Sequence, residues 1–136
     1  MKAKDYLLQV ERIVKMINIK QKEIDKLRLM TEYKAVRYDI ERVSGGTPTD
    51  RTDIICKIVD YEIELKKDIE RLIELKKEII KTIEVINNTD YVTLLYLRYF
   101  EFKTWEEISI DMHFSYRWVL IMHGRALNEV EKIISQ

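Results

Sequence analysis

A seven-residue hydrophobic repeat in the middle of the chain constrains its fold most. Ile58, Leu65, Leu72, Ile79 and Ile86 recur every seven residues without a miss. The stripe is widened by neighbouring isoleucines, namely Ile55, Ile69, Ile73, Ile80 and Ile83. Lysines and glutamates fill the positions between them. This pattern is typical of a long helix that packs as in a coiled coil, so it predicts a helix over residues 52–86.

A second long helix is predicted before it. Residues 2–43 contain no glycine or proline, and Val10, Ile17 and Ile24 again recur at a spacing of seven. The pattern weakens at Thr31–Tyr33, where we expect a kink or break. Residues 44–50 (SGGTPTD) are the clearest Gly/Pro cluster and predict a loop. Two long helices joined by a short loop should fold back as an antiparallel hairpin.

The hydrophobic stripe of residues 52–86 is wider than one partner helix covers. Two explanations remain open. The C-terminal part of the chain can cover the remainder, or a second copy of the chain can do so. The width of the stripe favours the second copy, and we therefore expect a homodimer that forms through the hairpin.

The stretch Thr104–Val130 predicts two short helices joined by a tight turn. Thr104 and Glu107 have the spacing of a capping box, and Ser115 is a good N-cap for the following helix. The buried side of that helix would consist of Val119, Met122, Ala126 and Val130. A further helix, capped by Thr89 or Asp90, precedes the stretch. These offsets are those of a helix-turn-helix, whose second helix can lie in the DNA major groove.

The sequence thus predicts an all-α fold in two domains. Residues 1–88 would form a long, antiparallel, coiled-coil-like helical hairpin with its loop at 44–50, and residues 89–136 a helix-turn-helix domain. The 24 Lys/Arg and 24 Asp/Glu residues of the chain balance each other, but residues 90–136 hold five of the former and seven of the latter. This slightly acidic balance counts against tight non-specific binding to DNA.

Composition and motifs argue against several other classes of protein. Cys56 is the single cysteine, which fits a reducing compartment. No apolar run is long enough for a membrane span, and the charged first residues predict no signal peptide. Neither the two histidines nor the adjacent Glu106 and Glu107 have the spacing of a metal or catalytic site. We therefore expect no enzyme, no cofactor, no metal and no small-molecule substrate.

The run from Leu94 to Val130 resembles a known family. Its shared features are Leu97-Arg98-Tyr99, the Thr-x-Glu-Glu-Ile element from Thr104 to Ile108, Ser115 before the second helix, Val119 within it, and Arg125-Ala126-Leu127 after it. These features resemble region 4 of sigma-70-type transcription factors. With the long helices and the ELKKEII run (Glu74–Ile80), the whole chain is similar to small phage and prophage transcriptional regulators of Gram-positive bacteria, in the style of late-gene activators.

The resemblance implies a DNA-reading role for a recognition helix over residues 115–127. The candidate DNA-binding residues are Thr104, Ser115, Tyr116, Arg117, Trp118, Leu120, Ile121, His123 and Arg125. Arg117 has the donors for a bidentate contact to guanine, Tyr116 can bond a phosphate, and Leu120 can touch a thymine methyl group. The family is richer in polar residues at these positions. The usual glycine of the turn is replaced by His113, which must then accept a left-handed backbone.

Three interpretations of function remain open. The favoured one is a dimeric regulator that binds promoter-like double-stranded DNA in the bacterial cytoplasm, with RNA polymerase as a further partner. The second is an adaptor that binds only protein, and the third is a component of DNA packaging like a small terminase subunit. Trp118 is favoured as a packing residue and His123 as an ordinary surface histidine, whereas Leu120 and Ile121 are open between a protein interface and the groove.

Overall fold

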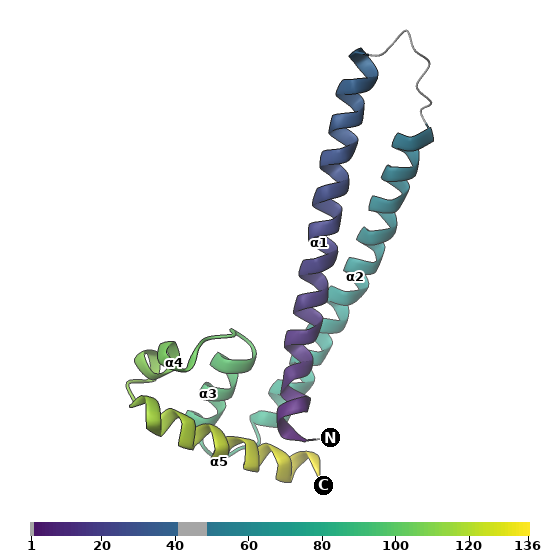
Figure 1. Cartoon of the computed structure of the whole chain (residues 1–136). Helices are drawn as coiled ribbons and strands as arrows, with labels where there is room; N and C mark the ends of the chain where they lie inside the picture. Colours follow the sequence, from purple (N-terminus) through teal and green to yellow (C-terminus); the bar gives the residue numbers. More distant parts are fainter. Residues whose placement is uncertain (1, 41–48) are drawn as a thin grey trace. The chain divides into compact units, whose positions relative to one another are not determined.

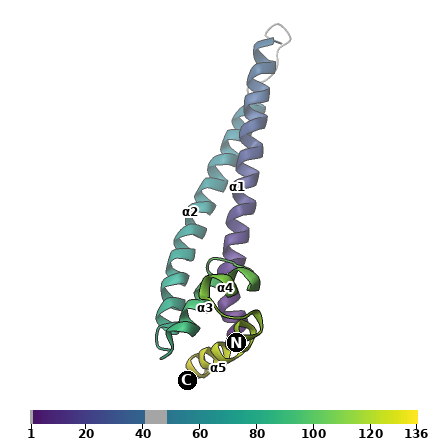
Figure 2. The same cartoon turned by 90° about the vertical axis from the view of Figure 1, so that its left-hand side faces the viewer.

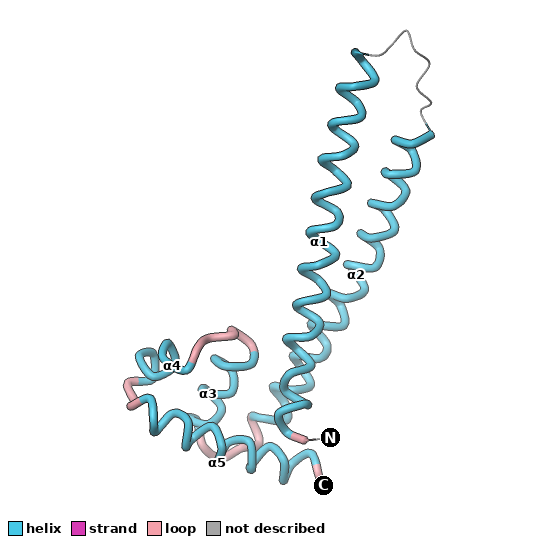
Figure 3. The backbone as a smooth tube through the Cα atoms, viewed as in Figure 1, coloured by secondary structure: helices cyan, strands magenta, loops and turns pink. Residues whose placement is uncertain are grey.

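The computed structural model describes residues 2–40 and 49–136, and all their regular secondary structure is α-helical. The helices are α1 (Ala3–Ile40), α2 (Thr49–Ile83), α3 (Thr89–Tyr99), α4 (Trp105–Met112) and α5 (Tyr116–Ile134). Figure 1 traces them in chain order, and Figure 3 shows only helices and connecting loops along the described residues. The predicted all-α class is confirmed. Within this part of the chain, no helix is long and apolar enough to cross a membrane.

The two long helices differ in detail from their predicted bounds. α1 continues without interruption through Thr31–Tyr33, so the break expected there is wrong. The hydroxyl of Thr31 donates to the carbonyl oxygen of Leu27 at 2.9 Å, within the same helix. α2 begins at Thr49, so the last two residues of the predicted loop 44–50 are helical. The rest of that loop, residues 44–48, lies outside the described residues.

Contacts divide the chain into two compact units. Unit 1 comprises Met1–Val14 and Leu72–Gln136, and unit 2 comprises Lys15–Arg71. The sequence predicted a division at residue 88. The contacts place the start of α1 and the end of α2 in the same unit as α3, α4 and α5 because these two segments contribute to its core.

Within unit 2, α1 and α2 run antiparallel. The ammonium group of Lys20 on α1 lies 2.6 Å from a carboxylate oxygen of Asp68 on α2, and Arg28 lies 2.6 Å from Glu62. Residues later in α1 therefore face residues earlier in α2. Both views show these parts of the two helices side by side (Figure 2). Ile24 is buried between polar neighbours, as the seven-residue repeat predicts.

Unit 1 holds the main hydrophobic core, to which all five helices contribute. Its buried residues are Ala3, Leu7, Val10, Ile79, Ile83, Ile86, Leu94, Leu95, Tyr99, Phe100, Ile108, Val119, Met122, Ala126 and Val130. The predicted buried face of α5 is thus confirmed. The hydroxyl groups of Tyr6 and Thr82 lie 2.9 Å apart and join the start of α1 to the end of α2.

The hydrophobic stripe of α2 meets two different environments. Ile79 and Ile83, with Ile86 just after the helix, are buried in the core of unit 1. Ile55 and Ile69, by contrast, remain exposed on α2. The C-terminal part of the chain therefore covers the end of the stripe and leaves a large part of it open to solvent. Burial of the covered part contributes roughly 2 kcal/mol for each isoleucine side chain removed from water.

Candidate nucleic-acid interface

α4 starts where the sequence predicts it. Thr104 is its N-cap, and the side-chain oxygen accepts from the backbone N–H of Glu107 at 3.2 Å. The hydroxyl group of Thr104 also donates to the carboxylate of Glu107 at 3.1 Å. In a full capping box the glutamate accepts from the backbone N–H of the cap residue instead. The pair therefore caps the helix, with the carboxylate bonded to the hydroxyl.

α4 ends in a left-handed residue. His113 has φ 59° and ψ 39°, the conformation that the sequence analysis required of it. The next backbone N–H, that of Phe114, donates to the carbonyl oxygen of Ser109 at 3.1 Å. This bond is the hallmark of a Schellman motif, which satisfies carbonyl groups at the end of a helix. Histidine tolerates the conformation better than a β-branched residue, so the turn forms without glycine.

α5 begins directly after this turn. Ser115 is its N-cap, and the side-chain oxygen accepts from the backbone N–H of Trp118 at 3.1 Å. The hydroxyl groups of Thr104 and Ser115, both candidate DNA contacts, thus serve as helix caps. α4 and α5 consequently meet across the three residues His113–Ser115, as predicted for this stretch.

The outer face of α5 is exposed and rich in large side chains. Tyr116, Trp118, Leu120 and Ile121 are 37–45% exposed, and Arg117 is exposed beside them. None of these five side chains contributes to the buried core. Trp118, which the sequence favours as a packing residue, is not buried within this chain, and its packing in a protein interface stays a prediction. It lies on the surface, where the guanidinium carbon of the likewise exposed Arg125 sits 5.2 Å from the centre of the Trp118 ring.

His123 is the one candidate that faces inward. It is half-buried, and its Nε2 atom lies 2.6 Å from the hydroxyl oxygen of Tyr99. Its ring centre lies 4.5 Å from that of Trp105. The structure thus places it neither with the exposed residues on the outer face of α5 nor among ordinary surface histidines. Its role is to link α5 to α3 and to the start of α4.

The surroundings of His123 form a polar and aromatic network that the sequence analysis missed. The guanidinium carbon of Arg98 lies 4.2 Å from the centre of the Trp105 ring, and Arg98 Nη1 donates to the carbonyl oxygen of Lys103 at 2.9 Å. Burial lowers the pKa of His123 to about 4, and the positive charges of Arg98 and Lys4 act in the same direction. Burial raises the pKa of Tyr99 to about 12. Both side chains are therefore neutral at neutral pH.

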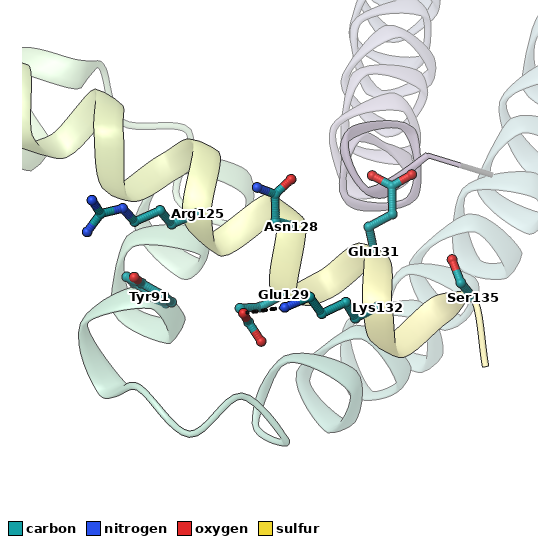
Figure 4. A pocket seen from close by; sticks show the side chains of 7 residues that line it. All are labelled: Tyr91, Arg125, Asn128, Glu129, Glu131, Lys132 and Ser135. Atoms are coloured by element: carbon teal, nitrogen blue, oxygen red, sulfur yellow. Dashed lines mark hydrogen bonds and ion pairs between the residues drawn. The ribbon is translucent and has the colours of Figure 1, made fainter.

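A second surface feature lies along the later half of α5. A pocket there is lined by Tyr91 of α3 and by Arg125, Asn128, Glu129, Glu131, Lys132 and Ser135 of α5 and its end. Figure 4 shows Arg125 at one side of it and the ion pair between Glu129 and Lys132, which is 3.2 Å long, in its middle. Its two basic and two acidic side chains balance each other, which favours neither an anion nor a cation. In the described residues, no group of three His, Cys, Asp or Glu could hold a metal ion.

Fold and surface together define an all-α protein with two long antiparallel helices and a tight α4–turn–α5 segment whose second helix keeps a large outer face free. The chain belongs to the family described as "Protein of unknown function (DUF1492)", which matches residues 29–131. The match therefore includes the last third of α1, all of α2 and α3, and nearly all of the α4–turn–α5 segment. No curated protein and no solved structure matches the chain.

Proposed function

We propose that this protein is a DNA-binding transcriptional regulator of phage or prophage type that acts as a homodimer in the bacterial cytoplasm. The observation that carries the proposal is the free outer face of α5, which starts immediately after a tight turn from α4. In helix-turn-helix proteins, the second helix lies in the major groove and its first residues meet the bases. The resemblance to sigma region 4 supports the same role for α5.

The residues of this face can make different kinds of contact with DNA. Arg117 carries the planar donor group that reads guanine, and Leu120 can contact the methyl group of thymine. Tyr116 can donate to a phosphate oxygen. Arg125, held over the ring of Trp118, adds a positive charge farther along α5. Two copies joined through the long helices would present two such faces, which suits a site made of two half-sites.

A second candidate function is an adaptor that binds only protein, for example RNA polymerase. The exposure of Trp118, Leu120 and Ile121 favours it, because large apolar side chains gathered on one surface mark protein interfaces. The acidic balance of residues 90–136 points in the same direction. An adaptor would bind no DNA even at low salt and would co-purify with the polymerase of its host. A small terminase subunit would instead form a ring of many chains.

Selection of bound sequences from random double-stranded DNA at low salt tests the proposal. We expect enrichment of a motif with two half-sites, and affinity that falls steeply as salt rises. The absence of any enriched sequence, together with co-purification of polymerase, would contradict DNA binding and support the adaptor.

The variant Arg117→Ala tests the reading role of that residue. We expect about a tenfold loss of affinity for the selected sequence and a relaxed preference at one base pair, since a bidentate contact contributes roughly 1–3 kcal/mol of discrimination. Arg125→Ala should weaken binding to all sequences alike, as loss of a phosphate contact does. Arg12→Ala, an exposed arginine on α1, is the matched control and should change neither property. An unchanged sequence preference in Arg117→Ala would remove Arg117 from base reading.

Gly124 allows stability and binding to be separated. It is exposed on α5, and a Cβ atom added there meets no atom within 4 Å. Because glycine in a helix costs about 1 kcal/mol relative to alanine, we expect Gly124→Ala to raise the free energy of unfolding by about 0.5–1 kcal/mol. We expect the same variant to bind DNA more weakly, because the added methyl group faces the DNA. A more stable variant with unchanged DNA affinity would show that the DNA does not approach this part of α5.

A further inference from the structure

α2 carries a second row of residues besides its buried and half-buried ones. The row consists of Ile55, Val59, Glu62, Lys66, Ile69 and Ile73. Its members follow each other in alternating steps of four and three residues, which keeps them on one face of a helix. All six are exposed, and the four apolar members are 41–49% accessible to solvent. β-branched residues in such a row are costly to leave in water and pack well between paired helices.

The order of the row is self-complementary. From either end it has two apolar residues, then two charged ones, then two apolar ones. When a second α2 lies antiparallel and is centred on Glu64, Ile55 of each copy faces Ile73 of the other. In the same register, Val59 faces Ile69. Glu62 then faces Lys66, and two-fold symmetry makes each of these contacts occur twice.

Parallel pairing of two α2 helices does not bring complementary residues together. A parallel pair in register would set Glu62 against Glu62 and Lys66 against Lys66, and like charges at such positions are destabilising. In the described part of the chain, Lys66 makes no ion pair. Glu62 binds Arg28 through Oε1 at 2.6 Å, and a carboxylate can accept further bonds. Both charges of the row are therefore available to a second copy.

α1 has a comparable row, exposed except for the half-buried Glu23, but its features favour pairing less. Its members are Met16, Ile19, Glu23, Lys26, Met30 and Tyr33. The charged pair is already joined within the helix, with the ammonium group of Lys26 3.5 Å from Glu23. Its apolar positions hold two flexible methionines, which specify a packing partner less well than isoleucine or valine does. The row on α2 is therefore the stronger candidate for a dimer interface.

We propose that α2 pairs antiparallel with α2 of a second copy of this chain through the row Ile55–Ile73. The inference rests on the homodimer of the proposed function and specifies its interface, orientation and register. The apolar residues at the two ends supply the burial, and the central Glu62–Lys66 contacts select the antiparallel register. Because the interface involves no residue of α5, dimer formation and DNA binding can be tested independently.

Charge reversal tests the register on the full chain without DNA. Sedimentation should give the mass of a dimer for the unchanged protein. Lys66→Glu and Glu62→Lys each set like charges opposite one another twice, so each alone should raise the dimer dissociation constant at least tenfold. An equal mixture of the two variants should restore the dimer, because one chain then carries two acidic and the other two basic residues. Lys67→Glu, a reversal of the adjacent exposed residue outside the row, is the matched control and should stay dimeric.

The same experiment separates the alternatives. A monomeric parent chain would overturn the proposal, as would a mixture that remains monomeric although circular dichroism shows both variants folded. Pairing of α2 with α1 of another copy would also prevent rescue, because Glu23 and Lys26 are unchanged in both variants. A mass well above a dimer would favour the ring. DNA binding by a monomer would overturn this interface and leave the proposed DNA-binding role intact.

Disulfide trapping tests the orientation. In a Cys56→Ser background, the double variant Ile55→Cys/Ile73→Cys should form a covalent dimer on mild oxidation. Ile55→Cys alone should not, because the two residues at position 55 would lie about 27 Å apart along antiparallel helices, at roughly 1.5 Å per residue. A covalent dimer of the single variant would indicate parallel helices and contradict the proposal.

Discussion

Replacement of Ile108 by alanine is expected to lower the free energy of unfolding by about 2–5 kcal/mol. Ile108 is 0% exposed and is the one fully buried residue of α4. Its side chain holds α4 against the core that α3 and α5 complete, so truncation leaves a cavity and loosens the helix that sets the turn. Small domains have only about 5–15 kcal/mol of stability, so the loss is a large part of the total. Urea unfolding followed by circular dichroism measures this loss of stability.

Ile110→Ala is the matched control for this prediction. Ile110 lies two residues farther along the same helix and is 71% exposed. Its truncation should change the free energy of unfolding by no more than about 0.5 kcal/mol, as is usual at the surface. The two variants lose the same atoms from the same helix. The difference between their losses in free energy of unfolding therefore reports burial alone. Equal losses would show that α4 does not pack through Ile108.

The α4–turn–α5 segment was predictable because its determinants are local. Thr104 and Ser115 cap helices by bonds to residues three positions ahead, and sequence spacing reveals such bonds directly. The buried face of α5 followed from the helical period. These inferences needed only a few neighbouring residues. The left-handed conformation of His113 was implied by the resemblance instead, because glycine usually occupies this place in the turn.

Helix ends were less predictable where several residues compete for one role. Asn88, Thr89 and Asp90 are consecutive, and each can cap a helix. The sequence predicted Thr89 or Asp90 as the N-cap. The structure shows Asn88, whose side-chain oxygen accepts from the backbone N–H groups of Asp90 at 3.0 Å and Tyr91 at 3.3 Å. Local preference does not separate these residues. The buried Ile86 fixes the chain just before them.

The environment of individual side chains on α5 depended on distant residues. Trp118 and His123 lie on either side of the buried row, and His123 is the nearer of the two, but helical period alone does not reveal which residues contact either side chain. In the described part of the chain, Tyr99 and Trp105 contact His123, whereas the ring of Trp118 has Arg125 of its own helix over it. This difference arises from the packing of α3 and α4. The spacing of residues within 115–127 therefore does not predict this difference in environment.

Acidification is expected to destabilise the protein through His123. The pKa of this side chain is about 4 in the folded protein, because burial and then the nearby charges of Arg98 and Lys4 disfavour the imidazolium. In the unfolded chain it is near 6.5. Between these values the unfolded state binds a proton that the folded state does not, so stability is full above about pH 6.5 and falls as the pH decreases towards 4. A half-buried imidazole is partly screened by solvent, and we expect a loss of about 1–2 kcal/mol.

The variant His123→Gln isolates this contribution. Glutamine does not titrate and keeps a polar group that can bond the hydroxyl group of Tyr99, so the loss of stability between about pH 7 and about pH 4.5 should become smaller by roughly 1–2 kcal/mol. Carboxylates also titrate in this range, and the difference between variant and parent removes their effect. His113→Asn removes the exposed histidine while its left-handed backbone remains accessible, so this control should lose stability on acidification as the parent does. If His123→Gln and the parent lose stability equally, then His123 is not the group whose burial opposes protonation.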